Sequence, residues 1–353
     1  DPDSYRRLAT GVYAEMVQAG ITCVCEFHYL HHLAGGGRYE DPNAMSEALV
    51  QAAADAGIRL TLLDTCYLSG GFGAPVEGVQ VRYADSDVDD WLQRVQQLDV
   101  NGHRVRLGAA LHSVRAVPSV AIPAVVEWAR HRGAPLHVHL SEQRAENEAC
   151  LGAHGCTPTH LLDTHGALGP SPTAIHATHL AAADTALLGG SNTGVCLCPT
   201  TEADLADGIG PATALTAAGS PLSLGSDGQT VIDLFAEAQA VENTMRLSTE
   251  TRGHFSGQEA ISMATLAGHR TLGWTDAGWI GPGARADLIS VDLDSVRLAG
   301  VPPQAVIAHA GSGDVRDVVV DGRLVVADRT HRTVPDVAAR LRTEIEALWV
   351  EAS

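Results

Sequence analysis

The stretch that decides the fold is Pro135-Leu-His137-Val-His139-Leu-Ser-Glu142, a short apolar run that passes directly into titratable side chains. Similar runs, each typical of a strand and each followed at once by polar residues, recur along most of the chain. The expected strands are 22–27, 59–65, 105–111, 135–140, 173–178, 194–198 and 221–225. Several are apolar on both faces, as parallel strands covered by helices should be.

Segments with helical spacing lie between these runs. Examples are 5–19, 44–56, 119–131, 213–218, 231–242 and 257–269. Strands that alternate with helices indicate an α/β protein with a parallel sheet. Because polar residues follow many of the strands and not only one, the pattern favours a (β/α)8 TIM-type barrel over a doubly wound sheet.

The two ends of the sequence do not fit a complete eight-stranded barrel. The chain opens on the helical segment 5–19, so we expect the barrel to lack its first strand here. We predict strands two to eight of the barrel in residues 1–278, the remainder of a composite β-domain in 279–333 and a C-terminal helix in 334–353. Within the β-domain, Asp321-Gly322 between two apolar runs predicts a β-hairpin.

Composition narrows the class of function. The formal charge is −19, and we find no basic stripe, so a nucleic-acid partner is not expected. No apolar run is long enough to span a membrane, and the first residues do not resemble a secretory signal. The seven cysteines fit no disulfide pattern and are expected as reduced core residues in the cytoplasm. We expect an enzyme for a small molecule, working as a homodimer.

Two side chains of the opening stretch suit hydrolysis. His139 ends a strand and could bind a metal, while Glu142 could carry protons between water and a leaving group. His176 and Asp227 end later strands, and the ends of parallel barrel strands meet at one mouth. The four residues together therefore predict a metal-dependent hydrolytic site, with His137 as a core residue behind it.

These motifs resemble the amidohydrolase superfamily in its deaminase branch. The resemblance is carried by His137-Val-His-Leu-Ser-Glu142, by His176 after the next strand and by Gly225-Ser-Asp227. More specifically, Glu26-Phe-His-Tyr-Leu-His-His32 and His112-Ser-Val-Arg-Ala-Val117 are similar to segments of the formimidoylglutamate deiminase family. That family hydrolyses N-formimino-L-glutamate to N-formyl-L-glutamate and ammonia in histidine degradation.

The resemblance implies roles for the residues at the strand ends. His139 and Asp227 would be ligands of one divalent metal, normally zinc. Asp227 would also take the proton of the attacking water, and Glu142 would pass it to the departing nitrogen. His176 would polarise the water and the imino carbon.

The resemblance also implies a substrate pocket. Tyr29, His112 and Arg115 would hold the substrate, with Arg115 paired with a glutamate carboxylate. A guanidinium suits this task because it can donate two parallel hydrogen bonds to a carboxylate.

One family feature has no counterpart in these residues. The superfamily opens with an H-x-H on its first barrel strand, and no such pair precedes His28. We therefore expect the chain to be part of a longer enzyme and to hold zinc weakly by itself. Two alternatives stay open: another deaminase of the superfamily, acting on a purine, triazine or amidine-like substrate, and a non-catalytic fragment that lacks the H-x-H.

Overall fold

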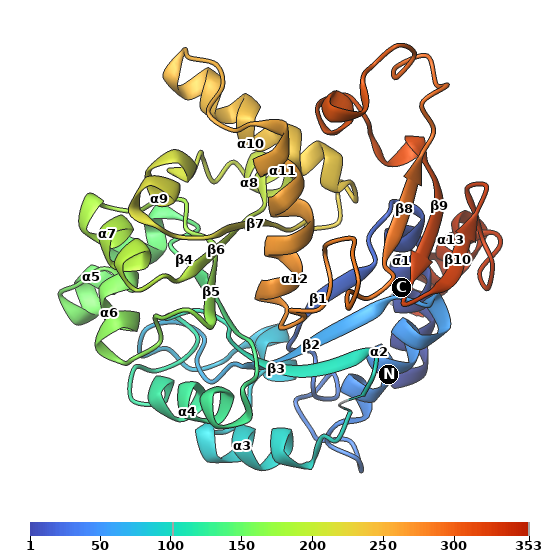
Figure 1. Ribbon diagram of the computed structural model, residues 1–353. Helices are drawn as coiled ribbons and strands as arrows, with labels where there is room; N and C mark the ends of the chain where they lie inside the picture. Colours follow the sequence, from blue (N-terminus) through green and yellow to red (C-terminus); the bar gives the residue numbers. More distant parts are fainter. Residues whose placement is uncertain (101, 352–353) are drawn as a thin grey trace.

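The computed structural model describes residues 1–100 and 102–351, and its main feature is a curled parallel sheet (Figure 1). Its seven strands are hydrogen-bonded in chain order, from β1 to β7. They are β1 (Cys23–His28), β2 (Arg59–Cys66), β3 (Val105–Leu111), β4 (Leu136–Leu140), β5 (Pro172–His176), β6 (Gly194–Leu197) and β7 (Leu222–Leu224). All the expected strands are present, and the TIM-like barrel that lacks one strand is confirmed.

The two edge strands are β1 and β7. Among the described residues, β1 pairs only with β2, and β7 pairs only with β6. The interior strands are deeply covered, since every residue of β2 is buried. Half of the residues of β2 are polar, and its two charged side chains are paired within the fold, Arg59 with Asp287 and Asp64 with Arg94.

The helices lie mostly around the outside of the sheet (Figure 1). They are α1 (Pro2–Gln18), α2 (Ala44–Ala56), η1 (Gly78–Arg82), α3 (Val88–Gln97), α4 (Ile122–Arg132), α5 (Arg144–His154), α6 (Pro158–Thr164), α7 (Ala182–Gly190), α8 (Pro199–Asp204), α9 (Ala212–Ala218), α10 (Leu234–Thr249), α11 (Gly257–Ser262), the π-helical η2 (Met263–Ala267), α12 (Gly268–Thr271), η3 (Pro303–Ala308), η4 (Ser312–Asp314) and α13 (Val337–Glu351). Each predicted helix is found, with shifts of a few residues at most boundaries. No helix in the described part of the chain has both the length and the apolar character needed to cross a membrane.

A second, antiparallel sheet follows the parallel one. Its strand order is β11 (Thr330–His331), β10 (Arg323–Ala327), β9 (Val315–Val320) and β8 (Leu288–Val291). The predicted hairpin joins β9 to β10, and its turn residues Asp321 and Gly322 have φ of 53° and 77°. Positive φ at both central residues is what a tight hairpin turn requires. The division into residues 1–278, 279–333 and 334–353 remains a proposal.

A buried ion cluster supports the loop that follows β1. The Arg94 guanidinium is 2.6 Å from an Asp64 oxygen and 2.8 Å from an Asp85 oxygen, and all three side chains are fully buried. His32 lies 3.6 Å from the same Asp85 carboxylate. Because buried charges need partners, this cluster ties α3 and β2 to the loop that begins at Tyr29.

Candidate active site

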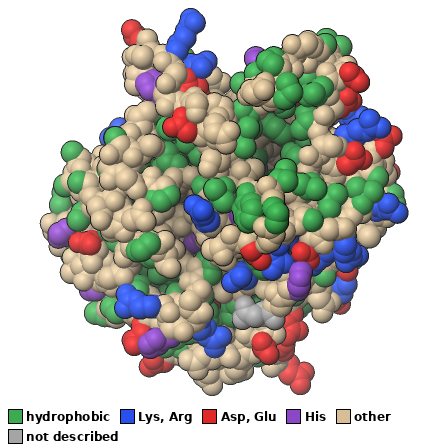
Figure 2. Space-filling view, in the orientation of Figure 1, with side chains coloured by type: hydrophobic (Ala, Val, Ile, Leu, Met, Phe, Trp, Pro, Cys, Tyr) green, Lys and Arg blue, Asp and Glu red, His purple; other side chains and the backbone are tan. Residues whose placement is uncertain are grey.

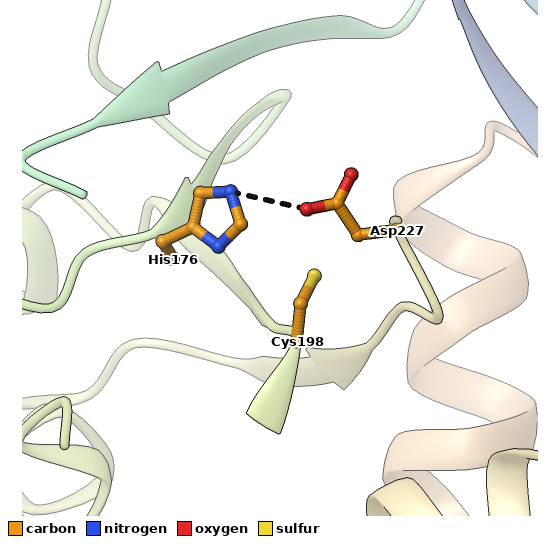
Figure 3. A group of neighbouring side chains, drawn as sticks. All are labelled: His176, Cys198 and Asp227. Atoms are coloured by element: carbon orange, nitrogen blue, oxygen red, sulfur yellow. Dashed lines mark ion pairs between the residues drawn. The ribbon is translucent and has the colours of Figure 1, made fainter. Parts of the chain in front are cut away.

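Three side chains with metal-binding atoms meet at the carboxyl ends of the strands (Figure 3). His176 ends β5, Cys198 follows β6 and Asp227 follows β7. Their ligand atoms all lie within 4.8 Å of one another, and His176 Nε2 is 3.5 Å from Asp227 Oδ2. Imidazole nitrogen, sulfur and carboxylate oxygen are all ligands that zinc accepts.

The backbone is unusual at two of these positions. The φ angle is 68° at His176 and 44° at Asp227. Residues other than glycine adopt positive φ uncommonly, and such residues gather at functional sites where the surrounding structure imposes the conformation. Both turns redirect the chain where its strand ends, and the two side chains point toward each other (Figure 3).

His139 lies beside this cluster. Its Nδ1 is 2.8 Å from the His112 carbonyl oxygen, and its ring stacks on the His176 ring at 5.8 Å. Burial, followed by the neighbouring imidazoles of His112 and His176, holds the pKa of His139 well below its ordinary value. A neutral His139 that donates from Nδ1 keeps a lone pair on Nε2, which is the form that binds a metal.

Three carboxylates surround His176. Glu202 contacts Nδ1 at 3.4 Å, while Asp227 and Glu142 lie 3.5 Å and 3.9 Å from Nε2. Burial lowers the pKa of His176, but the Glu202 hydrogen bond and the charges of Glu142 and Asp227 outweigh it and raise the pKa to about 9. The site therefore favours positive charge at this point, as a proton or as a metal cation.

Glu142 is placed by a sharp turn. The preceding residue, Ser141, is buried and has a φ of 49°. Burial raises the pKa of Glu142, although the nearby His176 lowers it. A raised pKa makes a carboxyl group a better proton acceptor, which suits a proton carrier.

Aromatic rings form the wall next to His139. The Tyr29 ring meets the His112 ring edge-on at 5.2 Å, and the His112 ring lies 5.3 Å from that of His139. Tyr67 and Tyr83 complete the cluster, with Tyr67 at 4.7 Å from His112 and Tyr83 at 5.0 Å from Tyr29. The predicted residues Tyr29 and His112 are thus brought together, and two further tyrosines join them.

Arg115 lies close to this wall. Its side chain is 42% exposed, and its Nε is 3.3 Å from the buried Glu146 carboxylate. Its charge contributes to the lowered pKa of His112, after the larger effect of burial. Among the described residues, Glu146 is its only ion-pair partner.

A cavity of about 410 Å³ opens beside the strand ends. Of the predicted site residues, Tyr29, His139 and Asp227 line it, and Cys198 lines it too. His176 contacts this group through Asp227, and Glu142 lies next to His176. His112 contacts it through the Tyr29 ring. Arg115 does not line the cavity.

Several side chains around this site are absent from the sequence prediction. Cys198 was expected only as a core residue, and it is both buried and one of the three clustered donors. Glu202 lies on α8, directly after β6, so the rule that polar residues follow strands could have found it. Tyr67 directly follows β2, so the same rule could have found it, whereas no local pattern marks Glu146 or Tyr83.

The comparisons with known proteins agree with this geometry. Residues 1–325 match the sequence profile described as the amidohydrolase family. The chain belongs to the amidohydrolase family. It is therefore a hydrolase of a metal-dependent family, as the strand-end residues predict, and its curated relatives place it among the deaminases.

Three similar proteins illustrate this relationship. Formimidoylglutamate deiminase of Pseudomonas aeruginosa is 35% identical over 346 residues, which cover 94% of this chain and 75% of that protein. A crystal structure of an amidohydrolase from Brucella melitensis superimposes with a TM-score of 0.91 at 30% identity, over 99% of this chain and 80% of that one. An adenosine deaminase from Xanthomonas campestris with bound zinc shares the fold, with a TM-score of 0.85 at 23% identity over 99% and 76% of the two chains.

The side chains of the site fit a zinc ion. The His112 carbonyl oxygen anchors Nδ1 of His139, and Glu202 anchors Nδ1 of His176. Imidazoles that bind metals are usually held in this way through the nitrogen that does not bind the metal. Asp227 and Cys198 add an oxygen and a sulfur next to His176.

Proposed function

We propose that the protein hydrolyses N-formimino-L-glutamate to N-formyl-L-glutamate and ammonia with the help of one zinc ion. The choice of substrate rests on the surroundings of the Arg115 side chain. Its charge acts on His112 and Tyr67 of the aromatic wall, and the one carboxylate paired with it among the described residues contacts Nε. Its terminal nitrogens can therefore receive a substrate carboxylate through two hydrogen bonds. The 35% identity to the Pseudomonas aeruginosa deiminase supports the same choice.

Asp227 would hold the metal, and His176 and Cys198 offer donor atoms next to it. His139 lies outside this group of three, beside the His176 ring, and would be the second ligand that the sequence predicts. When bound, zinc supplies Lewis acidity, which makes water a usable nucleophile near neutral pH. The carboxylates around His176 leave this point rich in negative charge, which a divalent cation would balance.

The chain's own side chains would move the protons. Asp227 accepts a proton from water as the water oxygen bonds to the imino carbon of the substrate. Glu142 lies 3.9 Å from His176 and delivers a proton to the terminal nitrogen. This first transfer, in which Glu142 passes on the proton taken by Asp227, leaves a hydroxyl and an amino group on the same carbon. The hydroxyl then gives its proton to the same carboxylate pair, and Glu142 delivers this second proton to the amino nitrogen. The carbon–nitrogen bond breaks, ammonia leaves with both protons of the water, and the carbon–oxygen bond becomes the formyl carbonyl. His176, held by Glu202, orients the water and the imino group during these transfers.

The proposal places the enzyme in histidine degradation, in the cytoplasm, as a homodimer. The seven free cysteines support a reducing compartment, since several of them lie close to one another in the barrel interior.

The direct test is to incubate zinc-loaded protein with N-formimino-L-glutamate and to measure ammonia and N-formyl-L-glutamate. We expect both products in equal amounts. Ammonia at the background rate, with zinc shown to be bound, would exclude the proposed reaction.

A second candidate is a deaminase for a planar ring such as a purine. The cluster of Tyr29, Tyr67, Tyr83 and His112 favours it, because aromatic walls stack well on flat heterocycles. The Arg115→Ala variant distinguishes the two candidates. Turnover that depends on Arg115 supports the formimino amino acid, whereas a purine deaminated at a rate independent of Arg115 supports the ring.

A further inference from the structure

Glu146 is a buried carboxylate on α5 with two partners in different parts of the site. Its side chain is only 1% exposed. One carboxylate oxygen, Oε2, accepts a hydrogen bond from Arg115 Nε at 3.3 Å. The other, Oε1, accepts one from the backbone N–H of Ser141, also at 3.3 Å. Burial raises the pKa of this carboxyl, while Arg115 and the Ser141 N–H act in the opposite direction.

The two partners of Glu146 serve different steps of the proposed reaction, which are substrate binding and proton transfer. Arg115 is the residue that would receive the substrate carboxylate. Ser141 is the left-handed residue between His139 and Glu142, so its backbone sets the direction in which Glu142 leaves the strand. Thus one buried side chain contacts both the arginine that would bind substrate and the turn that carries the proton carrier.

The contact with Arg115 has a specific consequence for recognition. Glu146 occupies Nε of the guanidinium and leaves the terminal nitrogens for another carboxylate. A long, 42% exposed arginine would otherwise sample several rotamers, and fixing it before binding reduces the entropy lost when substrate binds.

We propose that Glu146 is a positioning residue that fixes Arg115 relative to Glu142, and so sets the distance between the bound carboxylate of the substrate and the imino group that is hydrolysed. This inference rests on the proposed function for its substrate. Its structural part, the double contact of Glu146, can be tested without turnover.

Two variants separate the two contacts. Glu146→Gln retains an oxygen for the Ser141 N–H but presents an amide N–H to Arg115, which is itself a donor. Glu146→Ala removes both contacts. Glu148→Gln on the same helix is the matched control, because Glu148 is exposed.

For Glu146→Gln we expect KM for N-formimino-L-glutamate to rise about tenfold with kcat within about twofold of the parent, since a partly exposed charge-assisted hydrogen bond is lost. Glu146→Ala should lower kcat as well, because the turn at Ser141 is released. In an Arg115→Ala background, Glu146→Gln should have no further effect on KM. Unchanged KM in Glu146→Gln, or full additivity with Arg115→Ala, would overturn the proposal.

Hydrogen exchange measured by NMR tests the positioning of Arg115 by Glu146 without any substrate. In the parent protein, the Arg115 Nε–H and the Ser141 amide should exchange slowly, and Glu146→Gln should accelerate exchange at Arg115 alone. If the parent releases no ammonia but shows this pattern, the proposed reaction fails and the positioning by Glu146 stands. If Arg115 exchanges equally fast in both proteins, the positioning fails, whatever the activity. Thermal unfolding of each variant confirms that it is folded.

Discussion

His28, the last residue of β1, allows a quantitative test of how firmly the carboxyl end of this strand is buried. Its side chain is fully buried, and neither ring nitrogen has a hydrogen-bond partner among the described residues. The ring stacks on Tyr5 at 6.2 Å and meets the edge of His31 at 4.6 Å. Burial lowers the pKa of His28 to about 4, with a smaller opposing effect from Asp64.

The size of the effect follows from the difference between the folded and unfolded pKa. In the unfolded chain, histidine titrates near 6.5. Below this pH His28 is protonated in the unfolded chain, whereas in the folded protein it stays neutral down to about pH 4. Protonation therefore stabilises the unfolded state, and the free energy of unfolding falls as the pH drops below 6.5. Between pH 7 and pH 5 this one group should cost about 2 kcal/mol of unfolding free energy.

The assay is urea unfolding of the parent and of His28→Leu at pH 7, 6 and 5. Leucine is neutral and of similar size, and the absence of hydrogen bonds to His28 means that none is lost. All other titrating groups are common to both proteins, so the difference between their stabilities isolates His28. The parent should lose about 2 kcal/mol more than the variant over this range.

His160→Leu is the control, because His160 is exposed and its substitution should leave the pH dependence unchanged. Parallel stability curves for the parent and His28→Leu would refute the reasoning. They would mean that His28 takes up the proton in the folded protein, and hence that water reaches the end of β1.

Three further predictions concern the site and its support. Glu142→Gln should lower kcat for ammonia release about 10²- to 10⁴-fold without changing the thermal unfolding temperature, and a loss below tenfold would remove Glu142 from proton transfer. Arg115→Ala should raise KM for N-formimino-L-glutamate about tenfold to a hundredfold in steady-state assays, and an unchanged KM would disqualify it as the carboxylate partner. Arg94→Met should cost about 3–5 kcal/mol in urea unfolding, since it leaves the Asp64 and Asp85 carboxylates buried without their cation, and a cost below about 1 kcal/mol would contradict this role.

The parallel strands and the hairpin were predictable because their signals are local. Each strand is a short apolar run whose length and flanking residues are visible in the sequence, and 105–111 matches β3 at both ends. The turn at Asp321-Gly322 is equally local, since both residues adopt the positive φ that it needs.

Several helices were harder to predict from the sequence. The helical segments named from the sequence do not include α3 or the run from α5 to α8, most of which are short or polar. In α3 only Trp91, Arg94 and Val95 are buried, so the apolar stripe is interrupted by an arginine. Arg94 is compatible with burial only because Asp64 and Asp85 face it, and this pairing depends on the fold.

The sequence by itself determined the alternation of strands and helices, the polar residues at the strand ends and the resemblance to the amidohydrolases. These features depend on neighbours along the chain, which a single sequence displays directly. Only the tertiary structure decided which strand ends meet: Cys198 beside His176 and Asp227, Glu202 behind His176, and Glu146 between Arg115 and Ser141. These partners come from different elements, and the curvature of the sheet sets the distances between them. That curvature arises from the packing of the whole chain, so no single segment of the sequence contains it.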